Sequence, residues 1–422
     1  MRITITTGGS RGDLQPYLAL GIGLQRAGAD VRIATAKEFE SFVQGYGLDF
    51  YPVELDIQRV LGSLLEDSGG PLKLARGLAD QFGPVMEQNL ADFWSASEDA
   101  DAVIWGTSGF VGDYIARARD IPSASAEMQP ILRPTRYFRS SVVPPFPSFI
   151  TEGRAGEIAN RLSYVAVHEM FWQSFRKYIN GTLAKGLGLE PMIALEPGRR
   201  SDNIGEPVLC AWSPTVLPKP PDYGQEMHVT GYWFLDSDGW EPPSALTDFL
   251  ESGPQPVSIG FGSVNSKDAE KMLRSSLEAL KRSGHRAVLL TGWSGIEQCD
   301  LPDDVFALEE APHDWLFPRM AATVHHAGAG TTGASLQAGV PTITIPFLFD
   351  ERFWGERVAT LGAGPAPLPP RKASAERLAE TISYATTDKD FERRAKELGE
   401  RIRSEDGVAN AIHALEVGGV LR

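Results

Sequence analysis

The chain has 422 residues, of which 42 % are apolar and 23 % are charged, and its formal net charge is −15. This length exceeds what one ordinary hydrophobic core organises, so the composition predicts a globular protein of two domains. The negative charge argues against a nucleic-acid partner, because the phosphate backbone favours proteins with clustered Lys and Arg.

The apolar runs and the cysteines indicate what kind of protein this is and in which compartment it works. No run of about 20 apolar residues occurs, so we expect no segment that spans a membrane. Residues 1–6 have the pattern of a strand rather than of a signal peptide. Cys210 and Cys299 lie far apart and lack metal-ligand spacing, which favours a reduced, cytoplasmic setting.

The N-terminal part of the chain alternates between strand and helix patterns. The expected strands are 3–7, 31–35, 102–105 and 121–126. The expected helices are 14–27, 38–46 and 112–119. Such alternation predicts a parallel sheet that is covered by helices.

The middle of the chain departs from this pattern. Residues 129–147 are rich in prolines and aromatics without periodicity, which indicates a long loop. A helix is expected over 156–186, and its apolar stripe serves either the core or the lining of a groove. The stripe consists of Tyr164, Val167, Phe171, Trp172 and Phe175.

A second alternating series follows a strand at 208–212 and a proline-rich stretch at 213–221. Its expected strands are 256–261, 287–291, 305–308, 322–325 and 342–346, with a helix at 269–281. Two such series predict an α/β protein with two doubly wound domains. Ligands of these sheets bind at the carboxyl ends of the strands, which makes the turns there candidate sites.

The first candidate is the turn 8–13, Gly-Gly-Ser-Arg-Gly-Asp. Asp13 is either a plain helix-capping residue or a carboxylate at the rim of a cleft that accepts a proton from a hydroxyl. The second candidate is the turn 260–263, Gly-Phe-Gly-Ser, whose backbone N–H groups and Ser263 hydroxyl suit a phosphate. It matches neither the Walker pattern nor the dinucleotide fingerprint.

The third candidate is the stretch 325–339, which begins His325-His326 and continues with glycines and threonines at a strand-to-helix turn. Glycine lets the backbone approach a phosphate closely, and a helix N-terminus offers unpaired N–H donors and the positive end of a dipole. We therefore expect a phosphorylated ligand here.

Two further features flank this stretch. Asp350 and Glu351 are adjacent carboxylates after a strand, and they either grip vicinal sugar hydroxyls or form a solvated acidic turn. Trp315 either stacks on a nucleobase or packs against the protein.

The order and spacing of these motifs resemble the GT-B glycosyltransferases of the UDP-glycosyltransferase superfamily (family 1/28-like), especially the sterol glucosyltransferase and antibiotic-tailoring branches. The segments that carry the resemblance are 9–16 (GSRGDLQP), 160–180, 312–318 (PHDWLFP) and 325–332 (HHAGAGTT). The resemblance covers nearly the whole chain and implies two Rossmann-like domains that face an interdomain cleft. The implied parts are an acceptor domain at 1–215, a linker at 216–240, a donor domain at 241–400, and a C-terminal helix at 401–422 that packs back on the N-terminal domain.

The resemblance also implies which residues bind a UDP- or dTDP-sugar, with glucose as the expected sugar. The diphosphate falls to the glycine-rich turn, the base to Trp315, and the sugar to Asp350. The family pairs Asp with Gln where this chain has Asp350-Glu351, which leaves the identity of the sugar open. The implied donor-binding residues are Ser10, Arg11, Gly12, Ser263, Trp315, His326, Gly328, Ala329, Gly330, Thr331, Asp350 and Glu351.

The implied reaction is an inverting displacement in which an acceptor hydroxyl attacks the anomeric carbon. Asp13 takes the hydroxyl proton, while helix N–H groups and His326 stabilise the leaving diphosphate. No metal or other cofactor is expected. Two alternatives stay open: a nucleotide-sugar epimerase of the same fold, and a non-catalytic partner that activates another transferase.

The acceptor is expected in the N-terminal domain, beneath the loop 129–147. Its apolar lining implies a lipophilic alcohol such as a sterol, triterpenoid or polyketide. The expected contacts are Phe138, Phe146, Met170, Phe171 and Trp172. Peripheral contact of these loops with a membrane stays open too, although no basic cluster supports it.

Overall fold

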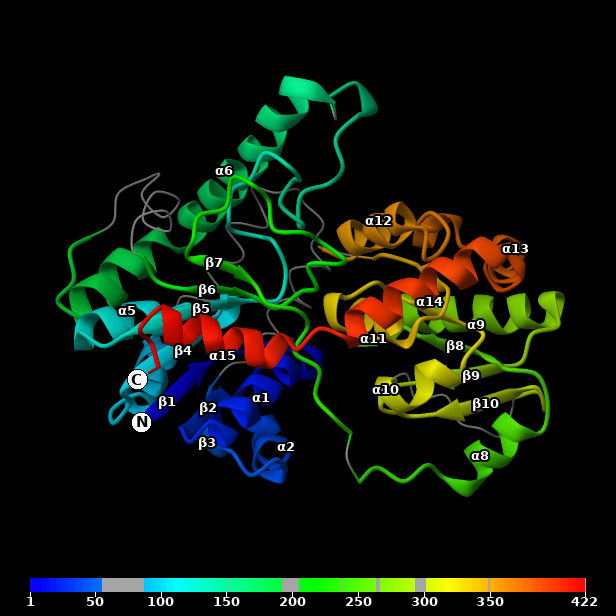
Figure 1. Ribbon diagram of the computed structural model, residues 1–422, viewed down its shortest axis with the longest axis horizontal. Coiled ribbons are helices and arrows are strands. Elements are labelled where there is room, and N and C mark those ends of the chain that lie inside the picture. Colours follow the sequence, from blue (N-terminus) through cyan, green and yellow to red (C-terminus); the bar gives the residue numbers. More distant parts are fainter. Residues whose placement is uncertain are drawn as a thin grey trace. The chain divides into compact units, whose positions relative to one another are not determined.

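A computed structural model of the chain shows two compact units (Figure 1). The described residues are 1–54, 87–150, 152–191, 205–237, 239–262, 266–292, 301–347 and 350–421. The first unit comprises Met1–Pro214, Pro218–Leu235 and Asp406–Arg422, and the second comprises Thr215–Leu217 and Asp236–Glu405.

The first unit is built on a sheet of seven parallel strands in the order β3-β2-β1-β4-β5-β6-β7. Its strands are β1 (Arg2–Thr6), β2 (Asp30–Ala36), β3 (Asp49–Val53), β4 (Ala102–Gly106), β5 (Ser123–Glu127), β6 (Val208–Cys210) and β7 (Met227–Val229). Its principal helices are α1 (Arg11–Arg26), α2 (Glu40–Gly45), α5 (Val111–Arg119), α6 (Gly153–Tyr178) and α15 (Gly407–Val417). The predicted α/β fold is confirmed, and the predicted strands match to within a few residues.

Two strands of this sheet escaped prediction. β3 follows α2, and β7 lies inside the stretch 216–240 that was expected to be a linker. β7 was not predicted because it has only three residues and follows a proline-rich stretch, so it shows no strand pattern of its own. The loop expected at 129–147 is present, and α6 continues as a π-helical turn over Ile179–Ala184.

The strand order reverses at β1, and this reversal defines where a ligand can approach. The turns that follow β1 and β4 are joined there by Ser108, whose hydroxyl donates to the carbonyl of Gly8 (2.6 Å) and accepts from its N–H (3.1 Å). The turn after β4 approaches so closely that a Cβ on Gly109 would lie 2.1 Å from the carbonyl oxygen of Thr6. Only glycine fits at this position.

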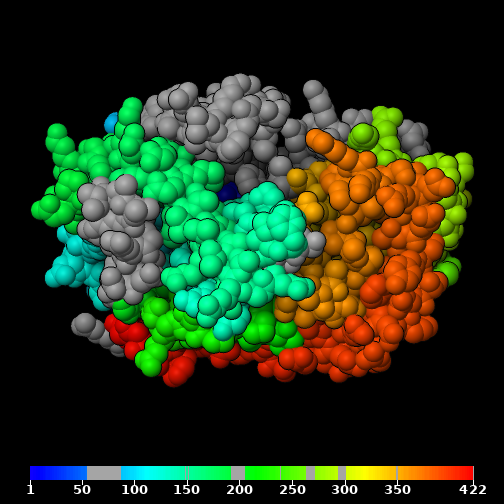
Figure 2. Space-filling model, turned by 90° about the horizontal axis from the view of Figure 1, so that it is seen from above, coloured from blue at the N-terminus to red at the C-terminus, as the bar shows by residue number. Residues whose placement is uncertain are grey.

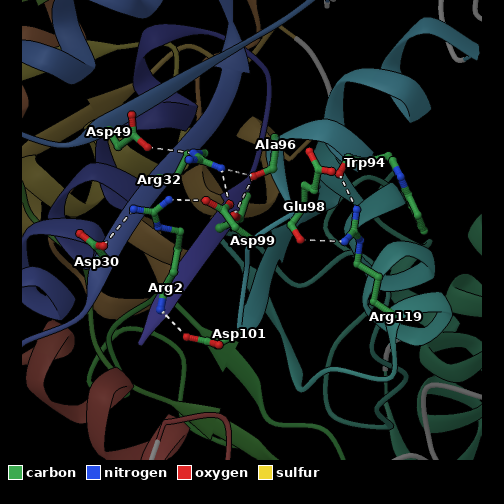
Figure 3. Close-up of polar contacts among 11 residues, drawn as sticks. Arg2, Asp30, Arg32, Asp49, Trp94, Ala96, Glu98, Asp99, Asp101 and Arg119 are labelled. Atoms are coloured by element: carbon green, nitrogen blue, oxygen red, sulfur yellow. Dashed lines mark hydrogen bonds and ion pairs between the residues drawn. The ribbon is translucent and has the colours of Figure 1, made fainter.

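Ion pairs join the opposite, amino ends of the same strands (Figure 3). Arg32 on β2 pairs with Asp49 on β3 and with Asp99 before β4, each at 2.8 Å. Arg2 on β1 pairs with Asp30 on β2 at 3.0 Å and also with Asp99. Four neighbouring strands, from the edge strand β3 to β4, are therefore tied together at this edge.

Helix α15 completes the first unit by packing on α1. A Cβ on Gly23 of α1 would lie 2.3 Å from Cγ1 of Val408, so the two helices touch backbone to side chain. Asn410 donates from Nδ2 to the carbonyl of Thr230 (2.9 Å), and Leu415 is fully buried in the core of this unit. Where one helix was expected over 401–422, the chain ends α14 at Arg403 and starts α15 at Gly407.

The second unit has a five-stranded parallel sheet in the order β10-β9-β8-β11-β12. Its strands are β8 (Val257–Gly260), β9 (Ala287–Leu290), β10 (Val305–Leu308), β11 (Ala322–His325) and β12 (Thr342–Thr344). Its helices are α8 (Ser244–Glu251), α9 (Ser266–Ser283), α10 (His313–Leu316), α11 (Ala329–Ala338), α12 (Glu351–Leu361), α13 (Ala375–Thr387) and α14 (Lys389–Arg403). The order reverses at β8, so the turns after β8 and β11 are neighbours.

Candidate functional site

Asp13 lies in the first turn of α1, at the carboxyl edge of the first sheet. Its Oδ2 accepts hydrogen bonds from the backbone N–H of Ser10 (2.8 Å) and from the Ser10 hydroxyl (2.9 Å). Both donors reach the same oxygen, and Oδ1 has no hydrogen-bond partner among the described residues. Asp13 therefore caps the helix with one oxygen and presents the other.

The surroundings of Asp13 favour a carboxylate that can act as a base. The residue is exposed, yet partial removal of water raises the pKa of the carboxyl more than the two Ser10 hydrogen bonds lower it. Gly9 has φ +122°, and a Cβ there would lie 2.6 Å from Oδ2 of Asp13, so this position requires glycine. The guanidinium of Arg11 lies 4.6 Å from the ring centroid of Phe42, and Gly12 is exposed beside it.

A buried ion pair stands at the end of β5, on the same edge of the sheet. Arg133 donates from Nε to Oε1 of Glu127 (2.7 Å) and from a terminal nitrogen to the hydroxyl of Ser125 (3.0 Å). The other Glu127 oxygen, Oε2, is buried without a hydrogen-bond partner in the described structure. This pair fastens the start of the loop 129–147 to the sheet. The sequence pattern did not predict this pair, although a carboxylate directly after a small-residue strand was a usable signal.

The five predicted acceptor residues fall into two groups. Met170 is 37 % exposed, Phe138 and Phe146 are half-buried, and Phe138 meets the edge of Tyr223 with ring centroids 6.5 Å apart. These three side chains are thus at least partly exposed.

The other two belong to the packing beneath. Trp172 is 4 % exposed in a hydrophobic cluster with Tyr114. Phe171 packs against that cluster, with its ring 4.7 Å from Phe175 and 5.3 Å from Phe110. The core alternative for this stripe therefore describes Trp172, and Phe171 lies at its border.

His326 is the centre of the second unit's carboxyl edge, where it sits between two glycines. A Cβ on Gly262 would lie 3.0 Å from Cε1 of His326, and a Cβ on Gly328 would lie 2.6 Å from its Nε2. Ala327 between them has φ +72°, a conformation that non-glycine residues adopt at a cost. The imidazole ring is therefore held in a turn with a strained backbone at Ala327, and it occupies the space that side chains at Gly262 and Gly328 would fill.

The histidines at this edge are neutral at physiological pH. Burial, with a smaller effect of His313, lowers the pKa of His326 to about 4. Burial also lowers the pKa of His313 to about 4, and it lowers that of His325, whose Nδ1 accepts from the N–H of Ala327 (3.0 Å). Nδ1 of His326 is buried without a hydrogen-bond partner among the described residues. A neutral His326 retains one N–H for an anionic ligand.

The N-terminus of α11 provides the remaining donors of this turn. Gly328 is the N-cap residue, and Ala329, Gly330 and Thr331 form the first helical turn. Backbone N–H groups in a first turn have no partner inside the helix, and the helix dipole makes them favourable for anions. The predicted residues His326, Gly328, Ala329, Gly330 and Thr331 are therefore brought together. Ser263 lies outside the described residues.

Trp315 on α10 is held in place by two neighbours. Its ring meets that of Trp240 at 5.1 Å and an angle of 63°, and the guanidinium of Arg319 lies 4.2 Å above its face. A base that stacks on Trp315 must use the face opposite to Arg319.

Asp350 and Glu351 are anchored at the start of α12. Glu351 accepts from the backbone N–H of Phe347 (2.5 Å), and Asp350 accepts from the indole N–H of Trp354 (3.0 Å). Phe347 in turn meets Phe261, with ring centroids 6.0 Å apart, which places this turn beside the turn after β8. The two carboxylates therefore form part of the carboxyl edge and are not a freely solvated acidic turn.

The described part of the chain shows neither a metal-binding cluster nor a membrane-spanning helix. It contains no cluster of three or more His, Cys, Asp or Glu residues placed to hold a metal. None of its helices combines the length and the apolar character that crossing a bilayer requires.

Two segments of the chain match known protein families. Residues 3–126 match the glycosyltransferase family 28 N-terminal domain. Residues 284–416 match the domain described as erythromycin biosynthesis protein CIII-like, C-terminal domain.

The chain is 37 % identical over 430 residues to a sterol 3-beta-glucosyltransferase of Emericella nidulans, and 36 % identical over 426 residues to the sterol 3-beta-glucosyltransferase UGT80A2 of Arabidopsis thaliana. Both alignments cover 98 % of this chain, but they span 30 % of the fungal protein and 65 % of the plant protein.

A solved structure of the glycosyltransferase VinC in complex with dTDP superimposes with a TM-score of 0.69 at 21 % identity, covering 99 % of this chain and all of VinC. This similarity shows that the two parallel-sheet domains form the GT-B fold.

Proposed function

Because the chain belongs to the GT-B glycosyltransferases, with a family 28 N-terminal domain and an erythromycin biosynthesis protein CIII-like C-terminal domain, we propose that it transfers a sugar from a nucleoside-diphosphate sugar to a hydroxyl of a lipophilic acceptor, with inversion. One observation carries the proposal. Asp13 is held rigidly through Oδ2 by Ser10 and keeps Oδ1 for a substrate proton.

In this proposal Asp13 is the general base. The acceptor hydroxyl donates its hydrogen bond to Oδ1 and attacks the anomeric carbon on the face opposite to the leaving diphosphate. The raised pKa of Asp13 makes it a better base than an ordinary carboxylate. A hydroxyl is still a far weaker acid than Asp13, so correct positioning must supply much of the rate.

The donor is assigned to the carboxyl edge of the second unit. The first turn of α11 and the neutral His326 donate hydrogen bonds to the diphosphate, which accumulates charge as the sugar leaves. We assign the base to the open face of Trp315 and the sugar hydroxyls to Asp350 and Glu351. VinC was solved in complex with dTDP, which supports a nucleoside diphosphate as ligand, and we assign it to this edge on the donors described above. We expect the reaction to need no metal.

The acceptor is assigned to the first unit, against Phe138, Phe146 and Met170. The names of the fungal and plant relatives support a sterol as acceptor and glucose as the sugar. The same relatives do not favour an epimerase or a non-catalytic activator, because they are transferases.

The test is a transfer assay read by mass spectrometry. Purified protein is given UDP-glucose or dTDP-glucose with a panel of sterols, triterpenoids and macrolides, and we expect an acceptor whose mass grows by one hexose. Asp13→Asn is the matched control, which should retain the thermal shift caused by UDP or dTDP but form no product. Absence of a hexose product with every pair, or equal turnover by Asp13→Asn, contradicts the proposal.

A further inference from the structure

Exposed apolar side chains are concentrated on one short part of the first unit. Of the ten large apolar residues exposed among the described residues, six fall between positions 137 and 170. They are Tyr137 (60 % exposed), Phe149 (82 %), Ile158 (60 %), Leu162 (58 %), Val165 (44 %) and Met170 (37 %). Single exposed apolar residues are normal on protein surfaces, but such a concentration indicates an interaction site.

Three of these residues form a stripe on α6. Ile158, Leu162 and Val165 follow the spacing i, i+4, i+7, which places them on one face of the helix. The helix is already packed on another side, where Tyr164 is fully buried and Val167 is 7 % exposed. The stripe is therefore not needed for the core. Figure 1 shows that α6 extends past the strands of its sheet.

The loop 129–147 is fastened to the same helix, so that the two form one surface. Asn160 donates from Nδ2 to the carbonyl of Arg136 (2.8 Å), and the hydroxyl of Ser163 accepts from the N–H of Ser140 (2.8 Å). Tyr137 lies between these two attachment points in the loop. Phe149 belongs to the short helix Ser148–Ile150 that leads into α6. We call Tyr137, Phe149, Ile158, Leu162 and Val165 the α6 surface.

The charge of this region is opposite to that of the whole chain. Residues 129–165 contain five arginines, two glutamates and no lysine or aspartate, in a chain with a net charge of −15. Arg133 is consumed by the pair with Glu127, but Arg136, Arg154 and Arg161 are exposed around the stripe. The sequence did not suggest a basic cluster here, because the arginines are dispersed along the chain and only the folded loop and helix bring them to one surface. Figure 2 shows this segment, in teal to green, on the face turned toward the viewer.

We propose that the α6 surface docks on an anionic lipid bilayer. The apolar side chains enter the boundary between headgroups and acyl chains, and the arginines meet lipid phosphates. The helix lies on the membrane and does not cross it. The biological purpose rests on the proposed function: a lipophilic alcohol dissolved in the bilayer reaches Phe138, Phe146 and Met170 without passing through water.

The first experiment measures binding alone and requires neither donor nor acceptor. The protein is sedimented with vesicles of phosphatidylcholine containing about 30 % phosphatidylserine, and with vesicles of phosphatidylcholine alone. We expect binding to the anionic vesicles, weakened as salt rises from about 0.05 M to about 0.5 M. The triple variant Ile158→Ser/Leu162→Ser/Val165→Ser should bind at least about tenfold less.

The control removes equally exposed apolar residues elsewhere. Tyr384 and Val417 are 53 % and 68 % exposed on other helices, and Tyr384→Ser/Val417→Ser should bind vesicles like the wild type. An equal loss in both variants overturns the proposal, as does wild-type protein that stays in the supernatant with anionic vesicles at low salt. A dimer in size-exclusion chromatography that the triple variant abolishes also overturns it, because the surface would then serve a second copy of the chain.

The second experiment separates this proposal from the proposed function. With sterol embedded in anionic vesicles, the triple variant should lose about tenfold in transfer rate, while sterol delivered by cyclodextrin should be glucosylated at the wild-type rate. An equal loss with both forms of sterol contradicts docking but leaves the transferase assignment intact. No transfer in either form by wild-type protein contradicts the transferase assignment, and the vesicle-binding result then decides docking by itself.

Discussion

The amino and carboxyl ends of the strands in the first unit use similar residues in opposite ways. At the amino ends, Arg2 and Arg32 bind three aspartates on neighbouring segments, and every one of these charges has a partner. At the carboxyl ends, Asp13 shares only one of its oxygens with Ser10, and Glu127 buries an oxygen that has no hydrogen-bond partner among the described residues. The charges at the amino ends are all paired and Glu127 is paired with Arg133, whereas Asp13 keeps one carboxylate oxygen available at the edge where a ligand approaches.

The carboxyl end of the second unit also has a polar group without a hydrogen-bond partner among the described residues, but there the group is neutral. His326 is held by Gly262 and Gly328 in a site that lowers its pKa to about 4, and its Nδ1 has no hydrogen-bond partner in the described structure. Such sites are stable only because the surrounding sheet and helices fix them. The contrast between the two ends can be tested residue by residue.

The largest effect is expected at Asp13. Asp13→Asn keeps an oxygen for the Ser10 hydrogen bonds but cannot accept a proton, so kcat/KM should fall by about 10²- to 10⁴-fold with the affinity for UDP unchanged. Ser10→Ala removes one of the two hydrogen bonds and should cost only about tenfold. Measurement of kcat/KM for both variants decides the point. A larger loss for Ser10→Ala than for Asp13→Asn would mean that the helix cap, and not the free oxygen, matters.

The next effect concerns stability at the two ends of the first sheet. Arg133→Met leaves the buried Glu127 without its partner and should lower the free energy of unfolding by about 3–5 kcal/mol. Asp49→Ala breaks an exposed pair at the amino ends and should cost less than about 1 kcal/mol. Denaturant unfolding of the two variants measures the difference. The double variant Glu127→Leu/Arg133→Met should recover most of the loss, and a double variant as unstable as Arg133→Met contradicts this explanation.

A third effect is expected for binding of the donor. A Cβ at Gly328 would lie 2.6 Å from Nε2 of His326, so Gly328→Ala should displace the imidazole and weaken the binding of UDP by about tenfold or more. Gly45→Ala is the control, since nothing lies within 4 Å of a Cβ at that position. Calorimetric titration with UDP measures both. Unchanged affinity in Gly328→Ala would remove His326 from the donor site.

The smallest expected effects concern the pH dependence of stability, which should differ between His326 at a carboxyl end and Asp99 at the amino ends. Because the folded pKa of His326 is about 4, below its ordinary value of 6.5, the unfolded chain binds more protons and stability falls as pH drops from about 6.5 to about 4. His313 and His325 contribute in the same window. The melting temperature of the wild type should therefore approach that of His326→Asn as pH falls from about 6.5 to about 4.

Asp99 at the amino ends acts in a lower window. Burial alone would raise its pKa, but hydrogen bonds from Arg32 and Arg2 and the charge of Arg32 hold the pKa below the ordinary value of 3.8. Its stabilisation is present above that value and is lost as pH falls further, so only there should Asp99→Asn approach the wild type. Convergence of Asp99→Asn above pH 5 would contradict the ion-pair assignment.

Sequence patterns predicted the contrast only in part. The glycines and histidines at 325–339 predicted a turn with donors for an anion, and the structure brings these residues together at the start of α11. The closeness of Gly262 to His326 could not be predicted, since it arises only when β8 and β11 pair across more than sixty residues. The network of Arg2, Arg32 and Asp99 has the same origin in the parallel sheet.

The α6 surface was hidden for another reason. A helix that is packed on one side and exposes apolar residues on another shows no clean hydrophobic periodicity, so the sequence pattern did not single out Ile158, Leu162 and Val165. Conversely, Trp172 read as a ligand contact and is in the core. Exposure depends on which elements cover a helix, and no local pattern contains that information.

The packing of α15 on α1 has a consequence for how the protein is made. Leu415 and Ala411 of α15 belong to the same core as Leu18 and Leu24 of α1, and Gly23 leaves room for Val408. During translation α1 is synthesised almost four hundred residues before α15, and the whole second unit is synthesised between the two helices. The first unit thus spends most of translation with the α15-facing side of α1 uncovered, and we expect chaperones to recognise that side until residues 406–422 emerge.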